Sequence, residues 1–284
     1  LWGDAPMGMP VIGTLANIEG FTRADLVRHV QSHYVADRTV VAAAGNFDVE
    51  AWMALAAELF AAMPPAPNPS MARPPAPAAY VGQALARRFT QVSQVFVNIA
   101  WPLAPAQPDA MPGQRWRLAA AVAANLFGSG MSSPLSDTIR ERLGLAYTVD
   151  ATIDRGDAWA NFVVSAVTTP DKLDALVAAT AELLRAQAAA IDPVHLERAK
   201  NQLTVSRVRA AERTYATMEQ AVEELLASGT VRPAADTLAV IEDIGADEVR
   251  AVFERMQAQA PALAITGKGA SARSARQLAA RLMA

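Results

Sequence analysis

Arg140 and Tyr147 are the two residues of this chain whose types and spacing suggest chemistry. Arg140 falls near the end of a predicted short helix, and Tyr147 falls in a predicted strand that covers 146–153. A helix, a tight turn and a strand in this order can direct a guanidinium and a phenol at one point. The guanidinium can grip a carbonyl or a carboxylate with its forked donors. The phenol can donate a hydrogen bond to an oxyanion that develops during acyl transfer.

The stretch 128–147 carries the signals that would position this pair. Glycines flank a turn at its start, and Ser132 and Ser133 are suitable N-caps for the short helix that follows. Gly144 is the predicted end of that helix, because glycine adopts a left-handed backbone without strain. A plainer interpretation is also open from the pattern alone, in which the guanidinium makes a surface ion pair and the phenol ring packs at a sheet edge.

The remaining pattern predicts an α+β fold, a two-layer α/β sandwich with a mainly antiparallel sheet and helices packed on one face. We expect strands at 39–44, 92–101, 146–153, 158–168 and 263–266. We expect helices at 23–33, 49–62, 115–127, 170–189, 193–212, 215–228 and 247–256, with another at the C-terminus. Thr22 and Asp48 are the predicted N-caps of the first two helices.

A cluster of prolines divides the chain. Seven of the eighteen prolines lie between residues 64 and 77, where they exclude a helix or a central strand. We therefore predict three parts: 1–63 as the C-terminal part of a first domain, 64–80 as a proline-rich linker, and 81–284 as a second, similar domain. The first part is short for an independent domain and the chain begins without Met, so we expect it to be completed by another segment or chain.

Composition excludes several classes of protein. The 284 residues carry a formal net charge of −3 and form no clustered basic face, so we expect no nucleic-acid partner. The apolar runs are interrupted by charge, and we expect no membrane span. The chain has no cysteine, which fits an oxidising or a reducing compartment. Both the periplasm and the cytoplasm of a bacterium are therefore considered, and we favour the periplasm.

The chain holds three histidines, and two of them have the spacing of metal ligands. His29 and His33 are four residues apart on a predicted helix, which would place both on one face. No glutamate accompanies them in zinc-peptidase order and no third ligand can be named. We therefore favour solvated or capping histidines and predict no metal site in this chain.

The stretch 128–147 resembles the C-terminal-domain signature of the pitrilysin and mitochondrial-processing-peptidase family of zinc metallopeptidases, the inverzincins. The resemblance rests on a glycine turn, a Ser-Ser pair, a leucine, an Arg-Glu pair and the run Gly-Leu-Ala-Tyr. Pro134 departs from the pattern, because an arginine is common at that position. In this family the arginine and the tyrosine reach a zinc site and hold the peptide substrate. The resemblance therefore implies that Arg140 and Tyr147 are catalytic and, with Ser132 and Ser133, bind substrate.

The resemblance also implies a cofactor and a partner. Family members take their zinc ligands from His-x-x-Glu-His and a further glutamate, and this chain contains no such motif. We therefore expect zinc in the assembled enzyme, held by a separate zinc-bearing subunit of a heterodimer or by a missing N-terminal segment. This chain would be the non-zinc-binding part of a zinc metalloendopeptidase and inactive alone. The alternatives are a catalytically inactive scaffold subunit and a peptide-binding module that uses a sheet edge.

Overall fold

The computed structural model of the chain describes residues 1–65, 79–103, 113–156 and 159–283. The chain divides into two compact units, each described here by itself. Unit 1 consists of Leu1–Gly8, Ala76–Ser206 and Ala234–Ala284, and unit 2 consists of Met9–Pro75 and Arg207–Pro233. The three-part division predicted from the prolines stays a prediction, because most of the predicted linker lies outside the described residues.

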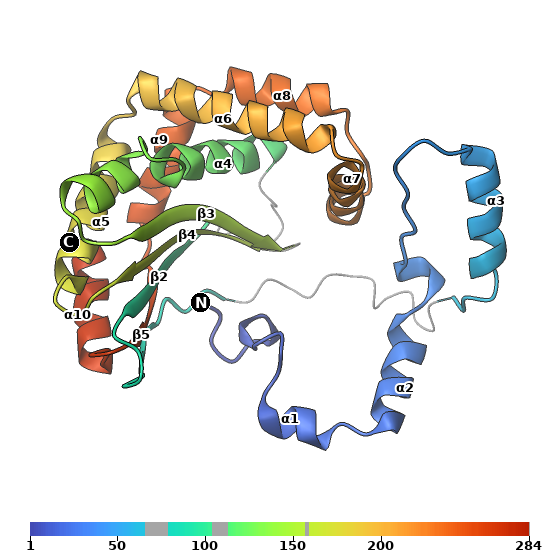
Figure 1. The fold of residues 1–284 in the computed structure, drawn as a ribbon, viewed down its shortest axis with the longest axis horizontal. Coiled ribbons are helices and arrows are strands. Elements are labelled where there is room, and N and C mark those ends of the chain that lie inside the picture. Colours follow the sequence, from blue (N-terminus) through green and yellow to red (C-terminus); the bar gives the residue numbers. More distant parts are fainter. Residues whose placement is uncertain (66–78, 104–112, 157–158, 284) are drawn as a thin grey trace. The chain divides into compact units, whose positions relative to one another are not determined.

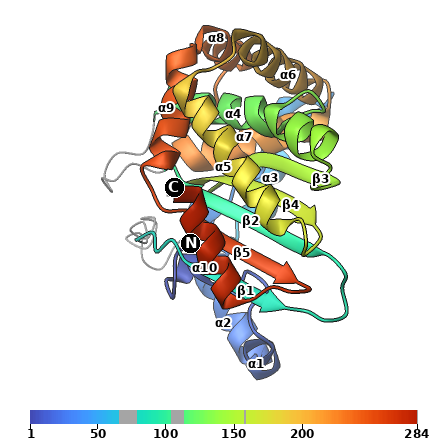
Figure 2. The same ribbon diagram turned by 90° about the vertical axis from the view of Figure 1, so that its left-hand side faces the viewer.

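Unit 1 is built on a mixed sheet that has five strands in the described part of the chain (Figure 2). The strands are β1 (Ala84–Arg88), β2 (Val95–Pro102), β3 (Thr148–Gly156), β4 (Trp159–Thr168) and β5 (Ala262–Gly267). They lie in the order β1-β5-β2-β4-β3, so β3 is an edge strand. β1 pairs with β5 in parallel, and the other pairings are antiparallel. The predicted fold class with a mainly antiparallel sheet is confirmed.

Helices cover one face of this sheet, as Figure 1 shows. They are α4 (Gln114–Gly128), α5 (Leu173–Ala189), α9 (Ala246–Gln257) and α10 (Ala272–Met283). α8 (Ala234–Asp243) packs on α4, and α6 (Pro193–Ala211) begins in unit 1. A short 3-10 helix at Pro6–Gly8 and a π-helical segment at Ser136–Arg142 complete the unit. α4 packs on β3, α10 packs on β1 and β5, and α9 packs against α4 and α5.

The core of unit 1 lies between the sheet and these helices. The inward residues of β2 alternate as the sequence predicts, and Val95, Val97, Ile99 and Trp101 are at most 2% exposed. Phe127, Phe162 and Phe253 form an aromatic cluster whose ring centroids are 5.7–6.1 Å apart. Offset and edge-on contacts of this kind stabilise a core beyond the area they bury. The cluster joins α4, β4 and α9.

Two elements of unit 1 were not predicted. β1 is short, and its sequence Ala-Leu-Ala-Arg-Arg lacks a clear alternation of apolar and polar residues. It is a strand because it pairs with β5, which lies far along the chain, and no local pattern predicts this pairing. α8 was also missed, and the predicted short helix after Ser133 takes a π-helical form.

Unit 2 contains helices with well-formed caps. They are α1 (Leu15–Gly20), α2 (Arg23–His33), α3 (Val49–Phe60) and α7 (Thr214–Ser228), with a 3-10 helix at Ala36–Arg38. Thr22 and Asp25 form a capping box, in which each side chain accepts a hydrogen bond from the other's backbone N–H. Asp48 accepts from the backbone N–H of Ala51 at 3.0 Å. The predicted caps of α2 and α3 are confirmed.

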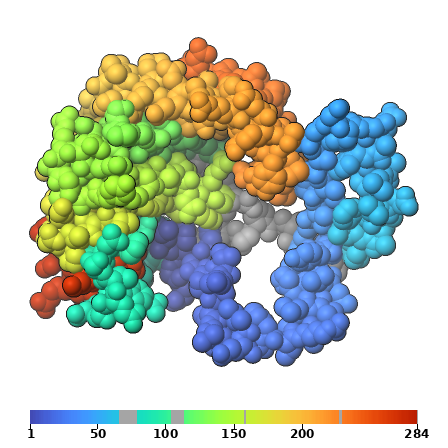
Figure 3. Space-filling view, in the orientation of Figure 1, coloured from blue at the N-terminus to red at the C-terminus, as the bar shows by residue number. Residues whose placement is uncertain are grey.

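Unit 2 leaves most of its apolar side chains exposed. Within 9–63 the one buried residue is Val35. The exposed apolar residues of this segment include Val11, Ile12, Leu15, Leu26, Leu55, Leu59 and Phe60. Figure 3 shows the segment 9–63 in blue.

The predicted strand at 39–44 is wrong for this structure. These residues are in no strand, although their sequence, Thr-Val-Val-Ala-Ala-Ala, favours one. A strand requires a neighbour to pair its backbone N–H and C=O groups. The described residues of unit 2 contain no strand that could pair with this segment.

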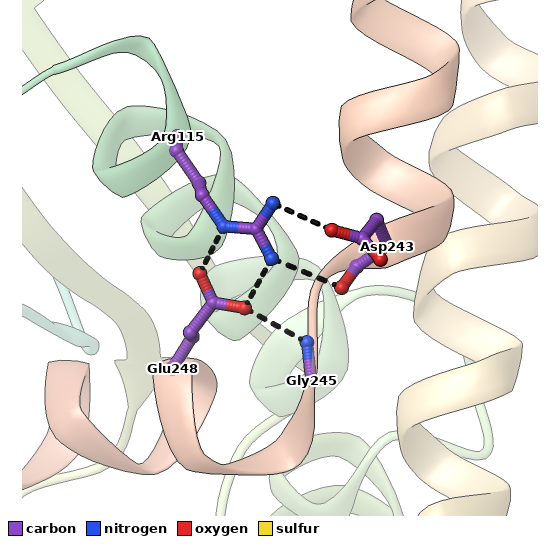
Figure 4. Close-up of polar contacts among 4 residues, drawn as sticks. All are labelled: Arg115, Asp243, Gly245 and Glu248. Carbon is purple, nitrogen blue, oxygen red and sulfur yellow. Dashed lines mark hydrogen bonds and ion pairs between the residues drawn. The ribbon is translucent and has the colours of Figure 1, made fainter.

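Arg115 links α4 to the junction between α8 and α9 (Figure 4). Its Nε donates to Oε1 of Glu248 at 2.5 Å, and its Nη2 donates to Oε2 of the same carboxylate at 2.8 Å. Its Nη1 and Nη2 also donate to the side chain and the backbone carbonyl of Asp243, at 2.7 and 3.1 Å. Gly245 N–H donates to Glu248 at 3.0 Å. The hydrogen bonds from Arg115 hold the pKa of Glu248 below its usual value, against the opposing effect of burial.

We expect Arg115→Met to lower the thermal unfolding midpoint at pH 7, because it leaves two carboxylates without their shared partner. The pKa of Glu248 is lower in the folded chain than in the unfolded chain, where a glutamate has a pKa of about 4.3. This difference stabilises the fold at pH values above about 4.3, and the stabilisation is lost as the pH falls through the pKa of the folded state. The difference in midpoint between parent and variant should therefore shrink in acid. Arg250→Met is the matched control, since Arg250 pairs only within α9 among the described residues. A difference that stays constant from pH 7 to pH 3 would contradict this account.

Candidate functional site

The turn between α4 and the π-helical segment is fixed by close packing at its glycines. A Cβ atom at Gly128 would lie 2.3 Å from the backbone nitrogen of Ala151, because α4 approaches β3 closely there. Gly130 has a φ of +81°, in the left-handed region that favours glycine. The glycines that looked like a turn signal in the sequence therefore set the distance between helix and strand and the direction of the chain.

Ser133 and Ser132 both have partners inside the protein. Ser133 is fully buried, its Oγ donates to the carbonyl of Gly130 at 2.8 Å, and it accepts from the N–H of Ser136 at 3.2 Å. This is the predicted N-cap. The Oγ of Ser132 accepts from Nη1 of Arg198 on α6 at 2.9 Å. Their predicted role in binding substrate stays a prediction, and neither lines the pocket described below.

Arg198 is a positioning residue that no sequence pattern predicted. Besides Ser132, its guanidinium donates to the carbonyl of Leu126 at 2.9 Å, so it ties both sides of the turn to α6. Burial lowers the pKa of Arg198. Nothing in its local sequence distinguishes it from the other charged residues of α6.

Arg140 and Tyr147 lie together, as the spacing predicted. The guanidinium carbon of Arg140 is 4.8 Å from the centroid of the Tyr147 ring, in a cation–π contact. Gly144, with a φ of +57°, reverses the chain between them. The Tyr147 side chain is 79% exposed. Nε of Arg140 lies 3.3 Å from Oε1 of its neighbour Glu141. Both functional groups are therefore accessible to a ligand.

Two side chains of the β4–α5 region donate hydrogen bonds to the turn that leads into Tyr147. Nζ of Lys172 donates to the carbonyl of Gly144 at 2.7 Å. Oγ1 of Thr168 donates to the carbonyl of Leu145 at 2.6 Å. These bonds satisfy carbonyls at the end of a helical segment, which would otherwise lack partners. They restrain the backbone directly before Tyr147.

A pocket of about 450 Å³ opens beside the pair. Its lining includes Gln94, Arg140, Glu141, Tyr147, Val167 and Lys172. The volume is within the range of small-molecule and peptide side-chain sites. The arrangement offers a guanidinium, a phenol, a primary amide and an ammonium to one ligand. Such a donor set suits carbonyl and carboxylate oxygens.

The described residues do not fit a zinc centre. No three His, Cys, Asp or Glu side chains converge anywhere in the part of the chain that the structure describes. His29 and His33 stack with ring centroids 4.3 Å apart, and Nδ1 of His33 lies 3.0 Å from the carbonyl of His29. Every helix in the part of the chain that the structure describes falls short of a membrane span, either in length or in apolar character.

Curated relatives are bacterial zinc proteases and a mitochondrial protein. The chain is 31% identical to an uncharacterised zinc protease of Mycobacterium bovis, over 96% of this chain and 62% of that protein. It is 30% identical to an uncharacterised zinc protease of Streptomyces coelicolor, over 94% of this chain and 58% of that protein. It is 24% identical to a probable mitochondrial-processing peptidase β subunit of Arabidopsis thaliana, over 88% of this chain and 48% of that protein. The chain thus spans less than two thirds of these relatives.

Solved structures share the fold. A peptidase M16 inactive domain from Pseudomonas fluorescens superposes with a TM-score of 0.75 at 20% identity, over 94% of this chain and 62% of the other. A respiratory complex III chain from Candida albicans gives a TM-score of 0.80 at 19% identity, over 95% of this chain and 66% of the other. At such identities the likeness concerns the fold alone.

The sheet of unit 1, with helices on one face, is the fold that these solved structures share. The family model described as the peptidase M16 inactive domain matches residues 20–203. This chain belongs to that family. The resemblance to the pitrilysin and mitochondrial-processing-peptidase family, found first in the stretch 128–147, is confirmed.

Proposed function

We propose that this chain supplies Arg140 and Tyr147 to a zinc peptidase whose metal is held outside the residues described here. The observation that carries the proposal is the exposed pair itself, with the guanidinium 4.8 Å from the phenol ring and a pocket beside it. The family description as an inactive domain, and the zinc-protease names of the relatives, support it. A surface ion pair alone would not require the phenol to stand exposed beside a pocket.

The two side chains have different roles in this proposal. The Tyr147 hydroxyl donates a hydrogen bond to the oxygen of the scissile carbonyl, and the bond strengthens as that oxygen becomes an oxyanion. Arg140 grips a neighbouring carbonyl or carboxylate of the peptide and orients it. Its cation–π contact and the bonds from Lys172 and Thr168 hold the pair in place before the substrate arrives.

The exposed apolar surface of unit 2 supports assembly with a zinc-bearing part. Side chains such as Leu26, Leu55 and Leu59 are more than half exposed on α2 and α3. Burying apolar surface stabilises an interface by about 25 cal/mol for each Å². We propose that the zinc-bearing part, a separate subunit or another segment of the same polypeptide, covers this surface and donates a neighbouring strand to 39–44.

Reconstitution tests the proposal. The chain and a zinc-bearing peptidase M16 domain with His-x-x-Glu-His are purified separately and mixed, and cleavage of a quenched fluorescent peptide is measured for each part and for the mixture. We expect cleavage by the mixture and none by this chain alone. Assembly is followed on the same samples by size-exclusion chromatography. An assembled, zinc-loaded mixture that cleaves no faster than the zinc-bearing part alone would favour a scaffold role.

A further inference from the structure

The pocket beside Arg140 and Tyr147 has an excess of positive charge. Arg140 and Lys172 contribute two cations to its lining, and Gln94 contributes a neutral amide. Glu141 is the one carboxylate among the lining residues, and it lies 3.3 Å from Arg140. One positive charge is therefore left without a balancing carboxylate in the pocket. A ligand with a negative charge would complete the site.

Lys172 is the group that carries the unbalanced charge. Its side chain lies at the start of α5, and its Nζ donates one hydrogen bond, to the carbonyl of Gly144 at 2.7 Å. An ammonium has three donors, so two remain. Within the described residues Lys172 forms no ion pair. The adjacent carboxylate of Asp171 is engaged by Thr169, whose hydrogen bond is the main cause of its lowered pKa, and Lys172 contributes only a weaker attraction.

The geometry allows one ligand to reach both cations. Lys172 bonds to Gly144, which belongs to the turn between Arg140 and Tyr147, so the two cations border the same short loop. A guanidinium binds a carboxylate with parallel hydrogen bonds, and an ammonium binds it as a point charge. The amide of Gln94 can donate to the same group. Val167 and Tyr147 supply the apolar walls for the carbons of the ligand.

We infer that this pocket binds a carboxylate of the peptide substrate, with Lys172 as a specificity-determining residue. The inference rests on the proposed function, since it concerns the same site. The carboxylate can come from an acidic side chain near the scissile bond or from the C-terminus of the peptide. Both present the same oxygens to Lys172, and a choice of peptides separates them.

The test measures kcat/KM of the reconstituted peptidase on matched peptides. The first set consists of peptide pairs that differ by Glu or its neutral isostere Gln at one position, with one such pair for each position around the scissile bond. The second set is one pair of peptides that end in a free carboxylate or in an amide. We expect the parent to favour the charged member of one pair by roughly fivefold, the upper end for an exposed ion pair. A preference within the first set identifies an acidic side chain, and one within the second identifies the C-terminus.

Variants of Lys172 separate charge from position. Lys172→Gln removes the charge and keeps a donor for the carbonyl of Gly144, so the preference for the charged peptide should fall to about one. Lys172→Arg keeps the charge and should retain the preference. Arg142→Met is the control, because Arg142 is exposed, pairs with Asp137 at 2.8 Å and does not line the pocket.

Two results would overturn the inference, and they differ in what they say about the proposed function. If the parent cleaves charged and neutral peptides equally, or if Lys172→Gln keeps the parent's preference, the pocket does not bind a substrate carboxylate through Lys172. Neither result would contradict the proposed peptidase function. If the assembled, zinc-loaded parent cleaves no peptide, the proposed function and this inference both fall.

Discussion

Tyr147→Phe is expected to lower kcat of the assembled peptidase about 100-fold, because it removes the hydrogen bond to the developing oxyanion and little else. The loss corresponds to about 3 kcal/mol of transition-state stabilisation. The Tyr147 side chain is 79% exposed, so the substitution should leave the fold intact. The tyrosine and phenylalanine side chains differ only in this hydroxyl.

The measurement is steady-state peptide hydrolysis by the reconstituted assembly. Tyr215→Phe is the matched control, since Tyr215 is also exposed and its hydroxyl donates only to the nearby Glu219 among the described residues. It should leave kcat at the parent's value. A Tyr147→Phe variant that is folded, assembled and as fast as Tyr215→Phe would show that the phenol takes no part in catalysis.

Gly128→Ala is expected to destabilise unit 1 by about 3 kcal/mol or more, the upper range for overpacking. The added Cβ would lie 2.3 Å from the backbone nitrogen of Ala151 and 2.5 Å from its Cβ. Backbone atoms of a paired strand cannot move aside as a flexible side chain can. To relieve the contact, α4 must separate from β3, which would also shift the turn that leads to Arg140.

Denaturant unfolding followed by circular dichroism measures this effect. Gly20→Ala is the matched control, because Gly20 also ends a helix, has no positive φ and has open space around its Cβ position. It should change the free energy of unfolding little. Equal unfolding midpoints for the two variants would mean that α4 and β3 are not in the close contact described here.

The sequence predicted those parts of the molecule whose signals are local. Thr22 and Asp25 identify the start of α2, and the alternation of Val95, Val97 and Ile99 identifies β2. The pairing of Arg140 with Tyr147 also follows locally, because a single turn at Gly144 brings them together.

The parts that were missed depend on distant segments. β1 becomes a strand by pairing with β5, and the predicted strand at 39–44 has no neighbour in the described residues. Lys172 and Gln94 join the site only when β2, β4 and the start of α5 come together around the turn. No local pattern could place them beside Arg140.

The most direct test of the central claim is the double variant Arg140→Ala, Tyr147→Phe in the reconstituted assembly, with zinc content and peptide hydrolysis measured on the same samples. Arg140→Ala should raise KM and lower kcat, since it removes substrate positioning. We predict that the double variant keeps the parent's zinc content and its assembled state, and loses at least about 99% of kcat/KM. Hydrolysis at the parent's rate would contradict the account and assign the pair a structural role.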